Sequence, residues 1–148
     1  LDRPAVIAIA CDYGAGMLAP VLEREWATVY PTDCAGNLHT SVVELLVRGG
    51  AGGVLVLSCH PRDCRNREGP RWLAARMYAG REAELEDRVD RRRVAVAPAG
   101  AYDGGAAAVV VRRFRDAIEA LDRPAGDANV DVDTMCERPP TPRRGARR

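Results

Sequence analysis

The chain has 148 residues and a mass of 16.0 kDa, which suits one ordinary domain and leaves no room for two. Hydrophobic residues make up 47% and charged residues 29%, a balance that argues against wholesale disorder. The 22 basic residues are all arginines, and 21 acids offset them to a formal charge of +1. This balance argues against a dedicated nucleic-acid-binding protein, which would carry a marked basic excess.

The first half of the chain alternates between strand and helix patterns. A β-branched apolar run at 5–10 predicts a buried first strand, and apolar residues at helical spacing over 16–24 predict a short helix, in which Pro20 fits only in the first turn. Residues 27–30 predict a second strand. A helix is predicted from about residue 40 until Gly49, with an inner face formed by Val42, Val43, Leu45, Leu46 and Val47.

The same alternation continues in the second half. Residues 53–58 form a continuous apolar run, which is typical of a strand buried on both faces of a parallel sheet. A long charged helix is predicted over 70–87, a fourth strand over 93–97 and a last helix over 106–121. The predicted inner residues of the two helices are Trp72, Leu73, Met77 and Leu85, then Val109, Val110, Phe114, Ile118 and Leu121.

Four strands alternating with helices predict an α/β fold. We expect a doubly wound, flavodoxin- or Rossmann-like parallel sheet of about four strands, with helices on both faces. The predicted domain spans 1–121. Periodicity stops there, and 122–148 is rich in Pro and Arg, which predicts a disordered tail or a linker.

Cysteine usage and hydropathy predict the compartment. Five cysteines are too few for a disulfide scaffold, and their odd number would leave one thiol unpaired in an oxidising compartment. The longest apolar run, at 5–11, falls far short of the roughly 20 residues that span a bilayer. We therefore expect a cytoplasmic protein without a direct membrane span, with Cys136 in the tail as a free thiol.

The other four cysteines follow the predicted strands. Cys11 follows the first strand, Cys34 the second, and Cys59 and Cys64 bracket the loop after the third. The carboxyl ends of parallel strands meet at one edge of a sheet, where ligands bind. Four thiols gathered in a reducing compartment favour a metal centre, either tetrahedral zinc or an iron–sulfur cluster. Only Cys59 and Cys64 are closely spaced, with four residues between them, whereas structural zinc sites favour two such close pairs, so an iron–sulfur cluster is favoured over zinc or an empty site. A four-residue gap also occurs in the plant-type arrangement for a two-iron two-sulfur cluster.

Three motifs resemble the delta subunit of methyl-viologen-reducing hydrogenase, also called the hydrogenase iron–sulfur subunit domain. They are Cys11-x-x-Gly14, Cys34-Ala-Gly36 and Gly-Val-Leu-Val-Leu-Ser-Cys-His-Pro-Arg-Asp-Cys at 53–64, and the likeness covers about 5–121. The resemblance implies a two-iron two-sulfur cluster on Cys11, Cys34, Cys59 and Cys64. It also implies electron transfer between a hydrogenase or other redox donor and a heterodisulfide-reductase A-like flavoprotein.

The chain departs from the family pattern near these motifs. The family's first motif is typically Cys-x-x-Cys, and here Gly14 replaces the second cysteine. Four cysteines still fill every terminal position of a two-iron cluster, and His60 or Asp63 would have to substitute if Cys11 were too distant. The family tends to have Gly and His where Arg62 and Arg65 stand. These changes leave the ligands alone and bear on the surface that docks a partner.

Other residues support rival or purely structural roles. Gly14-Ala-Gly16-Met-Leu-Ala19 fits a dinucleotide fingerprint, with Asp33 near the position of a ribose-binding acid, so nucleotide or flavin binding stays open. A zinc-bound or cofactor-free interaction module is a further alternative. We expect His39 to cap a helix or lie on the surface, and Trp72 and Tyr78 to pack on the sheet. Arg62, Arg65 and Arg67 would add positive charge beside Cys64, or form a solvated loop.

Overall fold

The computed structural model describes residues 5–25, 27–79 and 85–123. The strands are β1 (Val6–Cys11), β2 (Ala27–Thr32), β3 (Gly53–Ser58) and β4 (Val94–Pro98). The α-helices are α1 (Ala19–Glu23), α2 (Thr40–Arg48), α3 (Gly69–Tyr78) and α4 (Gly104–Leu121). Three short 3-10 helices, η1 (Ala15–Leu18), η2 (Ala35–Asn37) and η3 (Arg91–Arg93), precede α1, α2 and β4.

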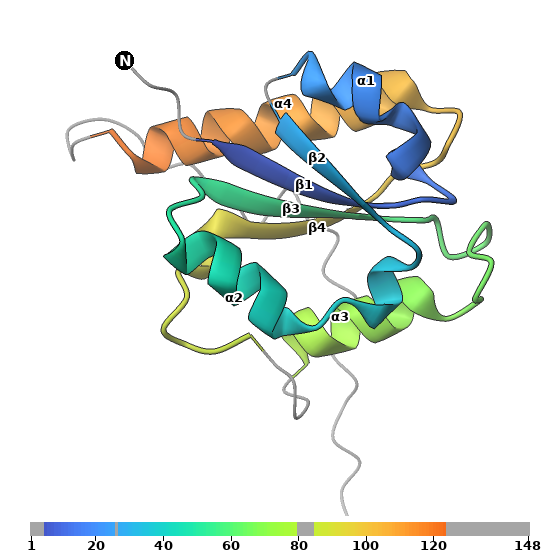
Figure 1. The fold of residues 1–148 in the computed structure, drawn as a ribbon, viewed down its shortest axis with the longest axis horizontal. Helices are drawn as coiled ribbons and strands as arrows, with labels where there is room; N and C mark the ends of the chain where they lie inside the picture. The colour runs from blue at the N-terminus through green and yellow to red at the C-terminus, as the bar shows by residue number, and fades with distance from the viewer. Residues whose placement is uncertain (1–4, 26, 80–84, 124–148) are drawn as a thin grey trace, which may run out of the picture.

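The four strands form one parallel sheet in the order β2-β1-β3-β4. Figure 1 shows α1 and α4 on one face of this sheet and α2 and α3 on the other. The prediction of an α/β fold with a parallel sheet covered on both faces is confirmed. The chain adds β2 on one side of β1 and then returns to add β3 on the other, so the strand order reverses between β1 and β3. Such a reversal opens a crevice at the carboxyl ends of the two strands, where ligands bind in α/β proteins.

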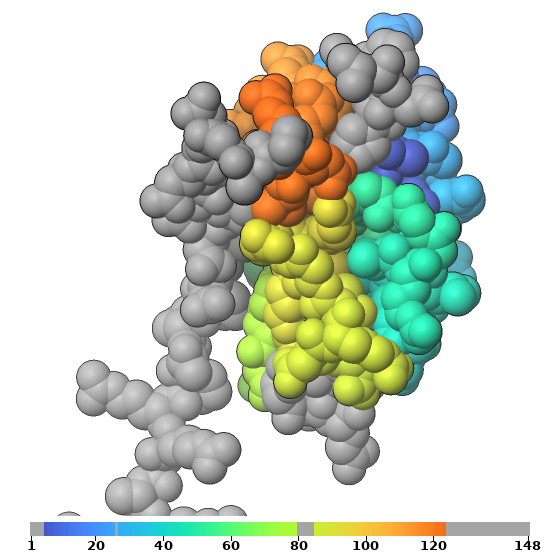
Figure 2. All heavy atoms as spheres, turned by 90° about the vertical axis from the view of Figure 1, so that its left-hand side faces the viewer, coloured from blue at the N-terminus to red at the C-terminus, as the bar shows by residue number. Residues whose placement is uncertain are grey.

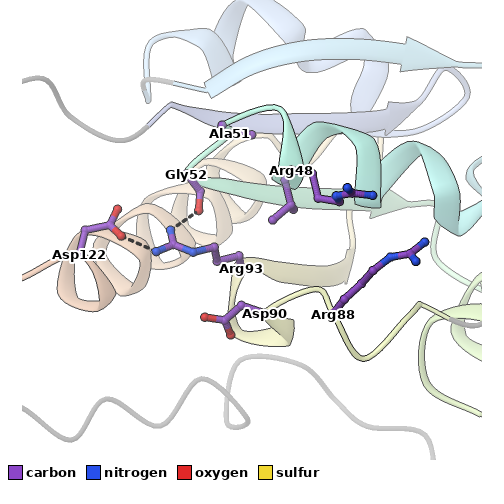
Figure 3. A pocket seen from close by; sticks show the side chains of 9 residues that line it. Arg48, Ala51, Gly52, Arg88, Asp90, Arg93 and Asp122 are labelled. Atoms are coloured by element: carbon purple, nitrogen blue, oxygen red, sulfur yellow. Dashed lines mark hydrogen bonds and ion pairs between the residues drawn. The ribbon is translucent and has the colours of Figure 1, made fainter.

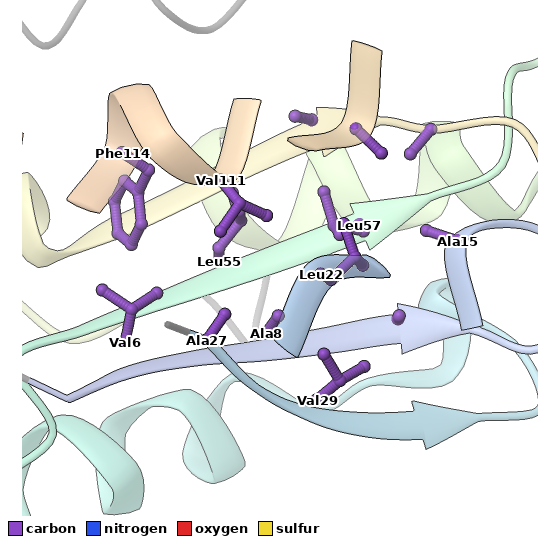
Figure 4. Close-up of a cluster of buried hydrophobic side chains, with 14 of the residues drawn as sticks. Val6, Ala8, Ala15, Leu22, Ala27, Val29, Leu55, Leu57, Val111 and Phe114 are labelled. Atoms are coloured by element: carbon purple, nitrogen blue, oxygen red, sulfur yellow. The ribbon is translucent and has the colours of Figure 1, made fainter. Parts of the chain in front are cut away.

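The sheet has a hydrophobic core on each face. All six residues of the central strand β3 are buried, as predicted for a strand covered on both sides, whereas β2 at the edge alternates between buried and exposed positions. The first core packs Phe114 and Val111 of α4 and Leu22 of α1 on the strands (Figure 4). The second packs Val43 of α2 and Leu73 and Met77 of α3 on the opposite face. These two cores fix the strand ends that carry the cysteines.

Two helices differ in extent from the prediction. The segment predicted as one helix over 16–24 is a 3-10 turn followed by α1, and Pro20 lies in the first turn of α1, where its missing N–H costs nothing. Helix α3 ends at Tyr78, well before residue 87. Leu85 is nevertheless buried and belongs to the second core.

Some residues predicted to face the core are exposed. Val42 is 41% exposed, Leu45 71% and Val109 40%, because the strict helical period places only part of an apolar run against the sheet. Trp72 is 41% exposed, so its expected packing on the sheet is wrong, whereas Tyr78 packs against the second core. The face of α4 that packs on the sheet includes small residues as well, since Ala107, Ala108 and Ala117 are buried.

The end of the predicted domain is tied to the sheet. Asp122 follows α4, and its carboxylate pairs with Arg93 at 2.5 Å. The predicted tail from residue 124 onward, including Cys136, lies outside the described residues. Within the described ranges, no helix has the length and apolar character needed to cross a membrane.

Candidate metal centre

Four cysteines from three segments meet at the carboxyl edge of the sheet. Cys11 is the last residue of β1, Cys34 stands between β2 and η2, and Cys59 follows β3 directly. Cys64 lies in the turns that lead from Cys59 to α3. All four are free thiols. The structure therefore brings together the residues that the strand pattern predicts to share an edge.

Cys11 and Cys59 form a close pair. Their Sγ atoms lie 3.2 Å apart, well beyond the length of a disulfide bond, and each residue is only 4% exposed. The pair arises because β1 and β3 are neighbours, with Ala10 opposite Leu57. The Sγ of Cys11 also lies 3.6 Å from the carbonyl oxygen of Asp33, to which it donates. This pair sits at the point where the strand order reverses.

Cys34 and Cys64 form a second pair across Gly69. A Cβ on Gly69 would stand 3.1 Å from the Sγ of Cys34 and 3.1 Å from the Sγ of Cys64, so the two sulfurs are at most twice that distance apart. Cys34 is buried and Cys64 is half-buried. Any side chain at position 69 would fill the space between the two sulfurs, which makes the glycine at the start of α3 part of the site.

The loop that carries Cys34 is held against α3. A Cβ on Gly36 would stand 2.5 Å from the Cα of Gly69, so η2 and α3 touch through backbone alone. The guanidinium of Arg76 in α3 donates to the carbonyl oxygens of Gly36 at 2.5 Å and Leu38 at 3.4 Å. The sequence marks Gly36 only as part of the Cys34-Ala-Gly36 motif and gives no signal for Gly69 or Arg76, because the contact between two glycines and the reach of one arginine depend on how the loops fold.

The four thiols are close enough to influence one another. Burial and the hydrogen bond with Cys11 raise the pKa of Cys59 to about 12, and the nearby thiols of Cys11, Cys64 and Cys34 act in the same direction. A buried group that interacts with three further sulfurs resists carrying a negative charge of its own. A bound cation would reverse this preference, since thiolates bind metals in their deprotonated form.

The turns after Cys59 are closed by backbone hydrogen bonds. Asp63 N–H donates to the carbonyl of His60, and Arg67 N–H donates to that of Cys64, both at 2.9 Å. Arg65 is held by Tyr13, since its guanidinium carbon lies 4.6 Å from the ring centroid and the same group donates to the Tyr13 hydroxyl. This contact joins the loops after β1 and β3, so Arg65 is more than a solvated charge.

The alternative ligands point elsewhere. His60 and Asp63 are exposed, and the ring of His60 approaches Gly100 in the loop after β4. His39 caps α2 as predicted, with its Nδ1 accepting from the Ser41 N–H at 3.2 Å. Within residues 5–25, 27–79 and 85–123, no three His, Cys, Asp or Glu side chains gather tightly enough around one point to hold a single metal ion. The sulfurs lie instead as two neighbouring pairs.

A comparison with protein-family models identifies the chain's relatives. Residues 6–122 match the family model described as methyl-viologen-reducing hydrogenase, delta subunit. The chain belongs to this family. The match covers every strand and helix of the domain and all four cysteines of the site, so the resemblance drawn from the three motifs is confirmed. It places the protein among hydrogenase-associated redox subunits.

Gly14 marks where the chain departs from the delta-subunit pattern. A Cβ on Gly14 would stand 2.9 Å from the carbonyl oxygen of Ala99 and 3.3 Å from the Sγ of Cys59. A side chain here would therefore enter the cysteine site, but only if the backbone at Ala99 moved. The same segment holds the glycines of the dinucleotide fingerprint, which normally open an α-helix. Here residues 15–18 form a 3-10 turn and α1 has only five residues, which does not match that pattern.

Two hollows open on the surface at opposite edges of the sheet. The one at the cysteine edge has a volume of about 300 Å³ and is lined by Cys34, Gly36, Asn37, Asn66, Gly69 and Trp72. The other, of about 500 Å³, lies at the opposite edge among the starts of β3 and β4 and the ends of α2 and α4. Figure 2 shows the side of the molecule that faces away from the carboxyl ends of the strands, where α2, the start of β4 and the end of α4 meet.

The larger hollow is held by ion pairs. Arg93 donates to the carbonyl of Gly52 at 2.7 Å and pairs with Asp122 (Figure 3). Arg48 and Arg88 both pair with Glu44. Because each of these arginines already has an acidic partner, the hollow has a structural explanation, and the cysteine edge is the stronger candidate for function.

Proposed function

We propose that the chain is an electron-transfer subunit or domain that carries a two-iron two-sulfur cluster on Cys11, Cys34, Cys59 and Cys64. The observation that carries the proposal is the arrangement of these four free cysteines as two pairs at the topological switch point of the sheet. A two-iron cluster takes two cysteines on each of its two irons. We assign Cys11 and Cys59 to one iron and Cys34 and Cys64 to the other.

The residues around the sulfurs fit such a group. The donors are four thiols, the ligands that iron–sulfur clusters take. Gly14 and Gly69 stand where side chains would press on the sulfurs, and both keep that space open. A zinc ion would require the four sulfurs around a single point, so their division into pairs favours the two-iron cluster over zinc.

The chain's own residues would shape the site. The cluster, when bound, takes up and releases single electrons. Cys11 and Cys59, both 4% exposed, keep water from one side of it. Arg65, held on Tyr13 beside Cys64, places a positive charge near the sulfurs, and such charge favours the reduced state, which is the more negative one.

The partners follow from the family. A delta subunit of a hydrogenase works beside other redox subunits, and the chain's own family match supports that role. We propose a hydrogenase or another redox donor on one side and a heterodisulfide-reductase A-like flavoprotein on the other. In this scheme the chain relays electrons and has no substrate of its own.

Iron binding by cysteine variants tests the proposal. The full chain, reconstituted anaerobically with iron and sulfide, is expected to bind two irons and two sulfides and to give the electron-spin signal of a reduced two-iron cluster. Cys59→Ser and Cys64→Ser should lose the cluster, because each removes one thiolate of a different pair. Cys136→Ser is the matched control and should bind as much iron as the wild type.

Three other results would contradict the proposal. A colourless protein with one zinc would indicate a structural metal site, and a yellow fluorescent protein would indicate a bound flavin. Full iron content in both Cys59→Ser and Cys64→Ser would show that the ligands lie elsewhere.

A further inference from the structure

The two cysteine pairs differ in how far they lie from solvent. Cys11 and Cys59 are enclosed in the second core, with the backbone of Gly14 packed against the Sγ of Cys59. Cys64 is half-buried, and Cys34 lines the hollow of about 300 Å³ at the protein surface. A centre held between the pairs would therefore be open on the Cys34 side and closed on the Cys11 side.

Two glycines lie between this hollow and the sulfurs. Gly36 and Gly69 line it and touch each other through backbone, and a Cβ on Gly69 would stand 3.1 Å from the sulfurs of Cys34 and Cys64. No side chain at either position separates the hollow from the sulfurs. Because electron transfer slows steeply with distance, a redox group seated in this hollow would lie where it can exchange electrons with a centre held by these sulfurs.

The rim of the hollow has the composition of a protein contact. Trp72 lines it and is 41% exposed, although its indole N–H donates to Glu68 at 3.2 Å. Tryptophan and arginine are enriched where proteins bind one another. The segment 60–72 carries arginines at 62, 65, 67 and 71 against acids at 63 and 68, so its net charge is positive.

We propose that this hollow, lined by Cys34, Gly36, Asn37, Asn66, Gly69 and Trp72, is the surface on which a redox partner protein docks to exchange electrons. The partner offers an acidic surface around its own redox group, to match the arginines of the segment 60–72. The inference rests on the proposed function, since it names the side from which the cluster is reached.

Filling the hollow tests the docking side. Asn66→Trp and Asn37→Trp each place a large side chain in the hollow from an exposed position on opposite walls. Ala51→Trp places the same side chain in the hollow at the other edge and is the control. The reconstituted, reduced chains are mixed with ferricyanide, a trianion, and oxidation is followed by stopped-flow absorbance.

The account predicts a selective loss of rate. Both hollow-filling variants keep two irons and the wild-type spectrum but are oxidised severalfold more slowly, whereas Ala51→Trp is oxidised at the wild-type rate. Added salt slows the oxidation of the wild type, because it screens the attraction between the arginines and the trianion. Hollow-filling variants that keep the cluster and react at the wild-type rate would overturn the proposal, as would a rate that rises with salt.

Alkylation of the metal-free chain tests the same asymmetry without the cluster. Iodoacetamide is expected to modify Cys64 and Cys34 before Cys11 and Cys59, as mapped by mass spectrometry, and Asn66→Trp should slow the modification of Cys34, which lines the hollow. Modification of Cys11 or Cys59 first would overturn the docking side and leave the cluster proposal standing. A wild-type chain that binds no iron would instead overturn the proposed function.

Discussion

Single residues at the cysteine edge carry two different duties. The cysteines supply the sulfurs, and Gly14, Gly36 and Gly69 leave the space around the cysteine loops free of side chains. The role of the glycines is harder to predict from a sequence, because a glycine before a helix or in a turn has many ordinary explanations. Here the distances decide, since a Cβ on Gly14 or Gly36 would stand less than 3.0 Å from a backbone atom, and a Cβ on Gly69 would stand 3.1 Å from two sulfurs.

Gly14 gives the residue-scale prediction. Gly14→Ala is expected to lower the free energy of unfolding by about 1–3 kcal/mol, the usual cost of overpacking, because its Cβ would collide with the carbonyl of Ala99. It should also reduce the iron retained after reconstitution, because the same Cβ approaches the Sγ of Cys59. Chemical denaturation and iron analysis measure the two effects.

Gly105→Ala is the matched control for that substitution. Position 105 lies in the first turn of α4, and, apart from its chain neighbours and the nearby backbone of α4, no described atom stands within 4 Å of its added Cβ. The variant should be as stable as the wild type or up to about 1 kcal/mol more stable, since alanine favours the helix. Equal stability of Gly14→Ala and Gly105→Ala would contradict the tight packing at Gly14.

At the scale of helices and strands, arginines and acidic residues form hydrogen bonds and ion pairs that hold neighbouring segments together outside the two hydrophobic cores. Arg76 ties α3 to the loop of Cys34, and Arg93 ties the start of β4 to the end of α4. Glu44 of α2 pairs with Arg88 at 2.5 Å and with Arg48 at 3.2 Å, and its side chain is only 11% exposed. These pairs set the position of the segment that precedes η3.

Glu44 gives a pH-dependent prediction. The hydrogen bond from Arg88 lowers the pKa of Glu44 below its usual 4.5, with help from Arg48 and against the effect of burial. Since the folded state prefers the ionised form, the pair stabilises the fold above about pH 4.5, and this contribution is lost as the pH falls through the lowered pKa. Glu44→Gln should therefore show a flatter decline of Tm on acidification than the wild type.

A double-variant comparison separates this pair from other carboxylates. Arg88→Gln should flatten the acid profile in the same direction, and Glu44→Gln combined with Arg88→Gln should add little to either change, because the two residues act through one contact. Full additivity of the two changes in Tm would show that the contact between them does not stabilise the fold.

Across the whole molecule, the sequence predicts best what depends on hydrophobic pattern. The run at 53–58 predicts β3 with its observed bounds, and the regular alternation of strands and helices predicts a parallel sheet with Cys11, Cys34 and Cys59 at one edge. Helix faces are predicted less well. Leu45 belongs to an apolar run but faces solvent, because successive residues of a helix point in different directions and only one face of α2 meets the sheet.

The arrangement of the sulfurs lies beyond sequence pattern. Spacing along the chain suggests that Cys59 and Cys64 are partners, but in the structure Cys59 is closest to Cys11, and Cys64 shares Gly69 with Cys34. The pairing depends on strand order and on the turns after Cys59. Neither can be read from the four-residue gap between the two cysteines.

Iron anomalous scattering from crystals of the reconstituted chain tests the central claim most directly. The account predicts two adjacent iron peaks, one bound by Cys11 and Cys59 and the other by Cys34 and Cys64. A single metal peak among the four sulfurs, or an iron bound by His60 or Asp63 in place of Cys11, would contradict it.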